Sequence, residues 1–158
     1  MNLLVVKSSV VGDNGNSSPL VNEQVERLKA QHPDATVVVR DLSADPIPHL
    51  DGERVGAFFT PADQRSEAQQ AVDDFSLALI EELKAADQVV LGLPMYNFGI
   101  PSQLQSWIDH VARARITFRY TENGPQGLLD NTPVTVLAAR GGLHAGTAQP
   151  TAPAQHEL

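Results

Sequence analysis

The sequence contains no cysteine. This absence excludes a disulfide framework, thiol catalysis and zinc or iron–sulfur sites held by cysteine. Positive charge is also scarce, because 11 Lys and Arg residues stand against 19 Asp and Glu residues and leave a net charge of −8. That balance argues against binding along a phosphate backbone, so we expect no nucleic-acid partner.

Long hydrophobic runs are missing as well. No apolar run approaches the roughly 18 residues of a membrane-spanning helix, so we expect no membrane association. The start of the chain lacks the charged, apolar and small-residue regions of an export signal, and we expect a cytoplasmic protein. The length of 158 residues, with 42% hydrophobic and 19% charged residues, fits one globular domain.

Hydrophobic periodicity predicts strands that alternate with helices. Aliphatic runs typical of strands buried on both faces of a sheet cover residues 2–7, 36–40, 88–93 and 133–138. Apolar residues at helical spacing predict a helix that begins after a Ser18 N-cap and ends at Gln31, and further helices over 62–86 and 102–113. In the helix over 62–86, the acidic and Gln residues lie opposite the apolar stripe. Residues 41–61 and 114–132 show no clear period.

This order of elements predicts a doubly wound parallel α/β sheet with strand order 2-1-3-4. Residues 143–158 lack the aliphatic run of a fifth strand, so we expect a domain over 1–144 that is truncated at its C-terminus. We expect 145–158 to be a low-complexity, disordered tail. Because such sheets bind ligands at the carboxyl ends of their strands, the candidate loops are 8–18, 41–61, 94–101 and 139–147.

The loop after the first strand, residues 8–18, is rich in Ser, Asn and Gly and leads into a helix N-terminus. Backbone N–H groups and the helix dipole favour an anion there. The loop lacks the Gly-Lys-Ser/Thr ending of a Walker A motif and lacks GxGxxG, which argues against a nucleoside triphosphate or a Rossmann dinucleotide. Neutral donors suit a phosphomonoester such as that of FMN. A plain polar connector is the alternative.

The loop after the third strand places two aromatic residues, a methionine and an asparagine between Pro94 and Pro101. A flat heterocycle could lie against Met95, Tyr96 or Phe98. A tight turn whose side chains fill the core is the alternative.

The fourth strand is followed by Arg140-Gly141-Gly142, where paired glycines permit close backbone approach to a ligand. Phe118 and Tyr120 could form a wall for a flat substrate or cover the core. The serines lack a GxSxG elbow and the histidines lack metal-ligand spacing, so we expect neither a serine hydrolase nor a metal site.

Several motifs occur together over residues 1–144: Lys7-Ser8-Ser9, Asn16-Ser17-Ser18, Pro94-Met95-Tyr96-Asn97-Phe98, Phe118-Arg119-Tyr120-Thr121-Glu122-Asn123-Gly124-Pro125 and Arg140-Gly141-Gly142-Leu143-His144. Together they resemble the bacterial FMN-dependent NADH-azoreductases, also described as NADH:quinone oxidoreductases of the flavodoxin-like fold. The resemblance implies a cytoplasmic homodimer in which FMN passes a hydride from NADH to quinones or azo compounds by a ping-pong scheme.

The resemblance also implies roles for individual residues. The residues that would hold the FMN phosphate are Ser9, Gly15, Asn16 and Ser17. The residues that would border the isoalloxazine are Met95, Tyr96, Asn97 and Phe98, with Ala139, Arg140, Gly141 and Gly142 on its pyrimidine side. The residues that would contact the substrate are Phe118, Tyr120 and His144. The flavin carries the chemistry, so no catalytic side chain is expected. Ala139 departs from a serine common in the family, and Gly15 from a hydroxyl-bearing residue.

Two other functions stay open from the sequence. A flavodoxin-like electron carrier would use the acidic surface to dock a basic redox partner and would turn over no substrate. An inactive, truncated reductase would follow if the missing end proved essential.

Overall fold

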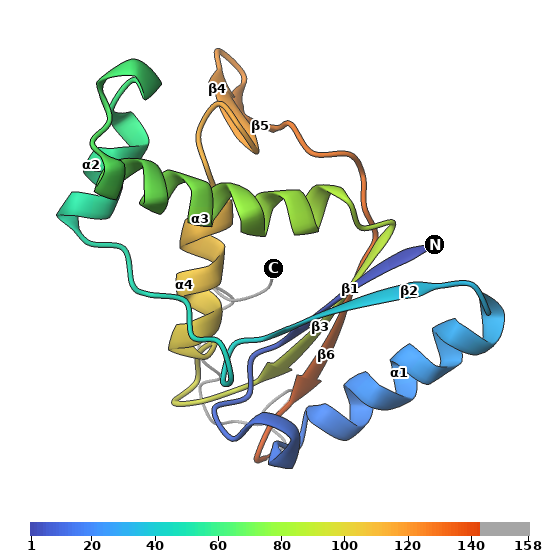
Figure 1. Cartoon of the computed structure of the whole chain (residues 1–158). Coiled ribbons are helices and arrows are strands. Elements are labelled where there is room, and N and C mark those ends of the chain that lie inside the picture. Colours follow the sequence, from blue (N-terminus) through green and yellow to red (C-terminus); the bar gives the residue numbers. More distant parts are fainter. Residues whose placement is uncertain (143–158) are drawn as a thin grey trace.

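The computed structural model describes residues 1–142, and within them a parallel sheet carries the fold. Its strands are β1 (Asn2–Lys7), β2 (Thr36–Asp41), β3 (Gln88–Pro94) and β6 (Val134–Ala139). The strand order β2-β1-β3-β6 confirms the predicted order 2-1-3-4 (Figure 1). The predicted tail over 145–158 lies outside the described residues.

Helices cover the two faces of this sheet. Helix α1 (Ser18–Gln31) lies on one face, and α3 (Glu67–Lys84) and α4 (Ser102–Val111) lie on the other (Figure 1). Successive residues of β1 point to opposite faces, so Leu3 packs with Val21 of α1 whereas Leu4 packs with Leu79 of α3. The central strand β1 therefore contributes side chains to the hydrophobic cores on both faces of the sheet.

The edge strands differ from the prediction that every strand is buried on both faces. Val39 of β2 is 54% exposed and Val134 of β6 is 56% exposed. Within residues 1–142, β2 pairs only with β1 and β6 pairs only with β3. An aliphatic run indicates that a segment favours a strand, but the position of that strand in the sheet decides how much of its surface is buried.

Two helices start away from their predicted positions. Helix α3 begins at Glu67 rather than at 62, because Ser66 and Gln69 form a capping box with N···O distances of 3.0 and 3.2 Å. The preceding residues form a short 3-10 turn, η2 (Ala62–Gln64). The N-cap of α1 is Ser17, not Ser18, whose hydroxyl instead donates to the Gly12 carbonyl at 2.8 Å.

Further elements fill the segments that showed no period. Helix α2 (Gly52–Phe59) begins where the Asp51 carboxylate accepts a hydrogen bond from the Arg54 N–H at 2.8 Å. Strands β4 (Phe118–Thr121) and β5 (Gly124–Gly127) form an antiparallel hairpin, and a 3-10 turn, η1 (Gly12–Asn14), lies in the first loop. Figure 1 shows the β4–β5 hairpin close to α3, far from the carboxyl ends of the sheet strands.

No helix among residues 1–142 is long and apolar enough to cross a membrane. The same residues contain no cluster of three or more His, Asp or Glu side chains that could hold a metal ion.

Candidate functional site

Three of the predicted ligand loops lie side by side at the carboxyl ends of β1, β3 and β6. The Tyr96 hydroxyl lies 3.4 Å from the Ser9 hydroxyl and accepts a hydrogen bond from the Val10 N–H at 3.3 Å. On the other side, the Met95 N–H donates to the Ala139 carbonyl at 2.9 Å. The loop over 94–101, called the aromatic loop below, therefore bridges the first loop (8–18) and the end of β6.

At two positions in this region only glycine fits, because neighbouring atoms leave no room for a Cβ. A Cβ on Gly15 would lie 2.0 Å from the Ser9 Oγ, and one on Gly92 would lie 2.7 Å from the Val21 Cγ2. Gly15 lets the first loop fold onto Ser9, and Gly92 lets α1 sit close against β3. The glycine at position 15 is thus part of the packing of the loop.

The first loop leaves backbone donors free just before α1. Within residues 1–142, the N–H groups of Asn16 and Ser17 have no acceptor, whereas the Ser18 N–H donates to the Gly15 carbonyl at 3.0 Å. The side chains of Ser9 and Ser17 lie beside them and are buried, at 1% and 2% exposure. Free N–H groups and hydroxyls at a helix N-terminus form a donor set that fits a phosphate.

The aromatic loop contains a tight turn held in an unfavourable backbone conformation. Tyr96 and Gly99 exchange two backbone hydrogen bonds of 3.0 and 2.9 Å, and the residues between them have positive φ, 50° at Asn97 and 61° at Phe98. This is the geometry of a type I′ turn, which Asn tolerates and Phe does not favour. The turn holds the Phe98 side chain 55% exposed at the site, an outlier typical of binding loops.

A small cavity of about 60 Å³ joins this turn to the end of β6. Its walls include Met95, Phe98 and Arg140, three residues predicted to border the same ligand. Ala139 is the last residue of β6, one position beyond the predicted strand end, and Gly141 and Gly142 follow it in exposed positions. The three loops that carry the twelve predicted cofactor residues thus follow the carboxyl ends of β1, β3 and β6.

Charged groups flank the first loop at the ends of β1 and β2. The Lys7 ammonium pairs with the Asp13 carboxylate at 2.7 Å. Desolvation alone would raise the pKa of Asp41. Hydrogen bonds from the hydroxyl and N–H of Ser43 and from the Ala44 N–H, with the charge of Lys7, outweigh it and lower that pKa. The Asp41 carboxylate is therefore a fixed negative charge next to the loop.

The predicted substrate residues do not join this site within one chain. Phe118 and Tyr120 lie in the β4–β5 hairpin and make an edge-to-face contact with ring centroids 5.4 Å apart. They line a separate groove of about 640 Å³ together with Phe58, Phe59 and three arginines, Arg113, Arg115 and Arg119. Tyr120 is 77% exposed. The predicted substrate residue His144 lies outside the described residues.

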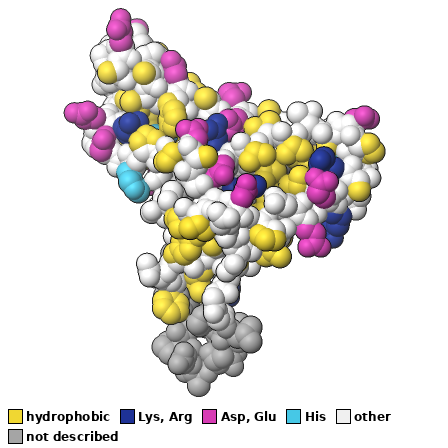
Figure 2. Space-filling view, turned by 60° about the horizontal axis from the view of Figure 1, so that its bottom comes forward, with side chains coloured by type: hydrophobic (Ala, Val, Ile, Leu, Met, Phe, Trp, Pro, Cys, Tyr) yellow, Lys and Arg dark blue, Asp and Glu magenta, His cyan; other side chains and the backbone are white. Residues whose placement is uncertain are grey.

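The single chain exposes large hydrophobic side chains both in this groove and elsewhere on its surface. Figure 2 shows one face, on which hydrophobic side chains lie in several patches between acidic and basic ones. Phe59 is exposed to the same degree as Tyr120, at 77%.

A buried ion pair that periodicity alone did not predict lies beside the groove at the β4–β5 hairpin, which its Arg113 also lines. Asp73 was placed on the polar side of its helix, but it is only 3% exposed. Its carboxylate accepts from Arg113 at 2.7 Å and from Arg65 at 2.5 Å. A pairing between residues 40 positions apart leaves no local signal in the sequence.

Comparison with known proteins places this site in a family. A profile described as flavodoxin-like fold matches residues 1–157. The FMN-dependent NADH:quinone oxidoreductase of Alcanivorax borkumensis is 78% identical over 151 residues, which are 96% of this chain and 76% of the relative. The chain therefore belongs to the flavodoxin-like-fold family that contains the FMN-dependent NADH:quinone oxidoreductases.

Solved structures agree with this assignment. The azoreductase from Bacillus anthracis str. Sterne has a TM-score of 0.85 at 28% identity, over 94% of this chain and 73% of that one. An FMN-dependent NADH-azoreductase from Bacillus anthracis str. Ames Ancestor, in complex with FMN, has a TM-score of 0.83 at 26% identity over 92% and 72%. The chain thus spans about three quarters of the length of these relatives.

Proposed function

We propose that this protein binds FMN noncovalently and uses it to transfer a hydride from NADH to quinones and azo compounds. The printed names of the relatives support the cofactor, the donor and the two acceptor classes. We also propose that it acts in the cytoplasm.

One observation carries the proposal most directly: the contact between Ser9 and Tyr96 places a phosphate-type donor loop beside an aromatic loop. FMN needs both kinds of surface, because one of its ends is a dianionic phosphate and the other is a flat ring system. In our assignment, Ser9, Gly15, Asn16 and Ser17 hold the phosphate.

The ring would lie against the turn at 95–98. Met95, Tyr96 and Phe98 offer apolar and aromatic surface, and the Asn97 amide offers a polar group at the tip of the turn. Arg140 and the backbone of 139–142 would face the pyrimidine side of the ring. Bound FMN supplies the two-electron chemistry between NADH and the acceptor, while the protein supplies orientation and electrostatics.

The two departures from the family pattern leave this assignment intact. Ala139 lacks a hydroxyl, but its carbonyl accepts the Met95 N–H and so fixes the aromatic loop. Gly15 offers no hydroxyl, but its missing Cβ leaves room for Ser9. We propose that the backbone N–H groups of the first loop replace the lost side-chain donor.

We further propose that the protein works as a homodimer. Phe118 and Tyr120 are far from the aromatic loop of their own chain, as Figure 1 shows for the hairpin that carries them. They can wall a substrate above the flavin only if a second copy brings its hairpin to that position. Small-angle scattering of the FMN-loaded protein tests this, and a monomer at assay concentration contradicts it.

Titration of the apoprotein with FMN tests the cofactor site. We expect the Ser9→Ala, Ser17→Ala double variant to bind FMN more weakly by about 1–3 kcal/mol, because donors to a charged group are lost. Ser102→Ala is the control, since Ser102 is an exposed serine at the start of α4. Equal FMN affinity in the double variant and in the wild type would show that the phosphate lies elsewhere.

The electron-carrier alternative makes a different prediction. A carrier would hold FMN but would not oxidise NADH when a quinone is its sole partner. In the proposed homodimer, the groove beside Phe118 and Tyr120 would supply space for a small substrate at the flavin of the second copy, which a carrier does not need.

A further inference from the structure

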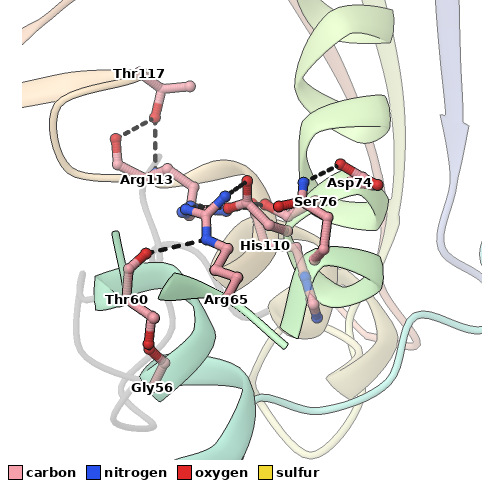
Figure 3. Close-up of polar contacts among 10 residues, drawn as sticks. Gly56, Thr60, Arg65, Asp74, Ser76, His110, Arg113 and Thr117 are labelled. Atoms are coloured by element: carbon pink, nitrogen blue, oxygen red, sulfur yellow. Dashed lines mark hydrogen bonds and ion pairs between the residues drawn. The ribbon is translucent and has the colours of Figure 1, made fainter. Parts of the chain in front are cut away.

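The segments that line the groove beside the β4–β5 hairpin converge on one buried carboxylate. Asp73 of α3 accepts from the Arg113 Nη2 at 2.7 Å and from the Arg65 Nη1 at 2.5 Å. Arg65 also donates from Nε to the Thr60 carbonyl at 3.0 Å, just past the end of α2. Figure 3 shows Arg65 and Arg113 approaching α3 together. Asp73 therefore joins the end of α2 to the end of α4.

Arg113 uses both terminal nitrogens and the face of its guanidinium in this cluster. A second nitrogen, Nη1, donates to the Ser76 Oγ at 2.8 Å, and that hydroxyl donates to the His110 carbonyl at 2.6 Å. The guanidinium carbon lies 3.5 Å from the centre of the Phe58 ring. Arg113 is 6% exposed. A planar fork can make these contacts at once, whereas the point charge of a lysine cannot.

The backbone of Arg113 makes hydrogen bonds to the residues that lead into the β4–β5 hairpin. Its carbonyl accepts from the N–H groups of Ile116 and Thr117 at 3.1 and 2.9 Å. Its own N–H donates to the Thr117 Oγ1 at 2.8 Å, and that hydroxyl lies 2.7 Å from the Val111 carbonyl. The residue whose side chain is bonded to α3 thus also holds, through its backbone, the turn that leads into the hairpin.

We propose that the Asp73–Arg113 pair is a positioning device that sets where the β4–β5 hairpin presents Phe118 and Tyr120 to the acceptor. The inference rests on the proposed function, because it assigns those aromatic residues to the acceptor. Arg113 is not among the twelve residues that we assign to FMN, so we expect a displaced hairpin to leave FMN binding unchanged.

Arg113→Lys and Thr117→Val test the proposal in the FMN-loaded protein. We expect the KM for a quinone to rise about tenfold, since a displacement of positioning groups by about 1 Å can lower the catalytic rate by up to about a hundredfold. FMN affinity should stay within about twofold of wild type. A cluster that only stabilises the fold would lower the midpoint of thermal unfolding without raising the quinone KM of the FMN-loaded protein.

Hydrogen exchange supplies a readout independent of activity. We expect the amides over 116–118 to exchange about tenfold faster in both variants, with β1 and β3 unchanged. Arg40→Met is the matched control, because Arg40 also pairs with α3, through Glu82, but lies away from the hairpin.

Unchanged exchange over 116–118 in Arg113→Lys would overturn the proposal, and so would an equal rise of the quinone KM in Arg40→Met. Wild-type protein that does not reduce quinones would refute the proposed function instead. The exchange comparison would then still decide whether the pair holds the hairpin.

Discussion

Replacing Gly15 by alanine tests the packing of the first loop. The backbone of Gly15 has φ −77° and ψ 149°, which alanine adopts freely, so the change alone would stabilise the protein by about 0.4–1 kcal/mol through the unfolded state. The new Cβ, however, would lie 2.0 Å from the Ser9 Oγ and 2.7 Å from the Ser9 Cβ. Rotation of Ser9 relieves only the first overlap, so the loop must move, at about 1–3 kcal/mol for overpacking.

We therefore expect Gly15→Ala to lower the free energy of unfolding by about 1 kcal/mol in urea titrations. Its FMN affinity should fall by about tenfold or more, because Ser9 leaves its position as a donor to the phosphate. Adding Ser9→Gly to the variant should restore stability but not FMN affinity. Gly56→Ala is the control: its Cβ meets nothing within 4 Å in α2, so it should stabilise the fold. A Gly15→Ala protein with wild-type stability and FMN affinity would refute the reasoning.

Three further predictions concern other parts of the chain. Burial lowers the pKa of His110 despite its hydrogen bond to the Pro48 carbonyl, so the unfolded chain binds more protons than the folded protein as the pH falls below 6.5. In urea titrations, the free energy of unfolding should therefore keep its full value above that pH and decrease below it. The decrease should be smaller in His110→Gln. Asp73→Ala should lower the free energy of unfolding by about 3–5 kcal/mol, since it leaves the buried Arg113 charge without its carboxylate, and a loss under about 1 kcal/mol would contradict this. Asn97→Gly keeps the positive φ and removes the amide, so stopped-flow kinetics should show slower flavin reduction by NADH at unchanged thermal stability; an unaltered rate would remove Asn97 from the flavin's edge.

The sheet could be predicted from the sequence because each of its strands is marked by a short run of neighbouring aliphatic residues. Four aliphatic runs and three patterned helices between them determine the strand order once connections are right-handed and short. Helix α2 was not predicted, because only Asp51 at its N-cap marks it and one of its eight residues, Ala57, is fully buried. Caps therefore carried information that periodicity did not: the Ser66 and Gln69 pair marks the true start of α3.

The candidate site was predictable as far as strand ends determine it. Residues at the carboxyl ends of β1, β3 and β6 must meet: Ser9 contacts Tyr96, and Ala139 accepts a hydrogen bond from Met95. The positions of Phe118 and Tyr120 were not predictable in this way, because a hairpin outside the sheet is placed by side-chain contacts. The contact that we propose to place it joins Asp73 of α3 to Arg113, two residues past the end of α4 and 40 positions away in the sequence.

The most direct test of the account is the visible spectrum of the FMN-loaded protein under anaerobic conditions. We predict that NADH bleaches the flavin absorbance and that a quinone, added next without oxygen, restores it, with NADH consumed in proportion to quinone reduced. The Ser9→Ala, Ser17→Ala double variant should lose this cycle as it loses FMN, and free FMN at the same concentration should not support it at a comparable rate. A wild-type protein that binds FMN but leaves it oxidised in the presence of NADH would contradict the account.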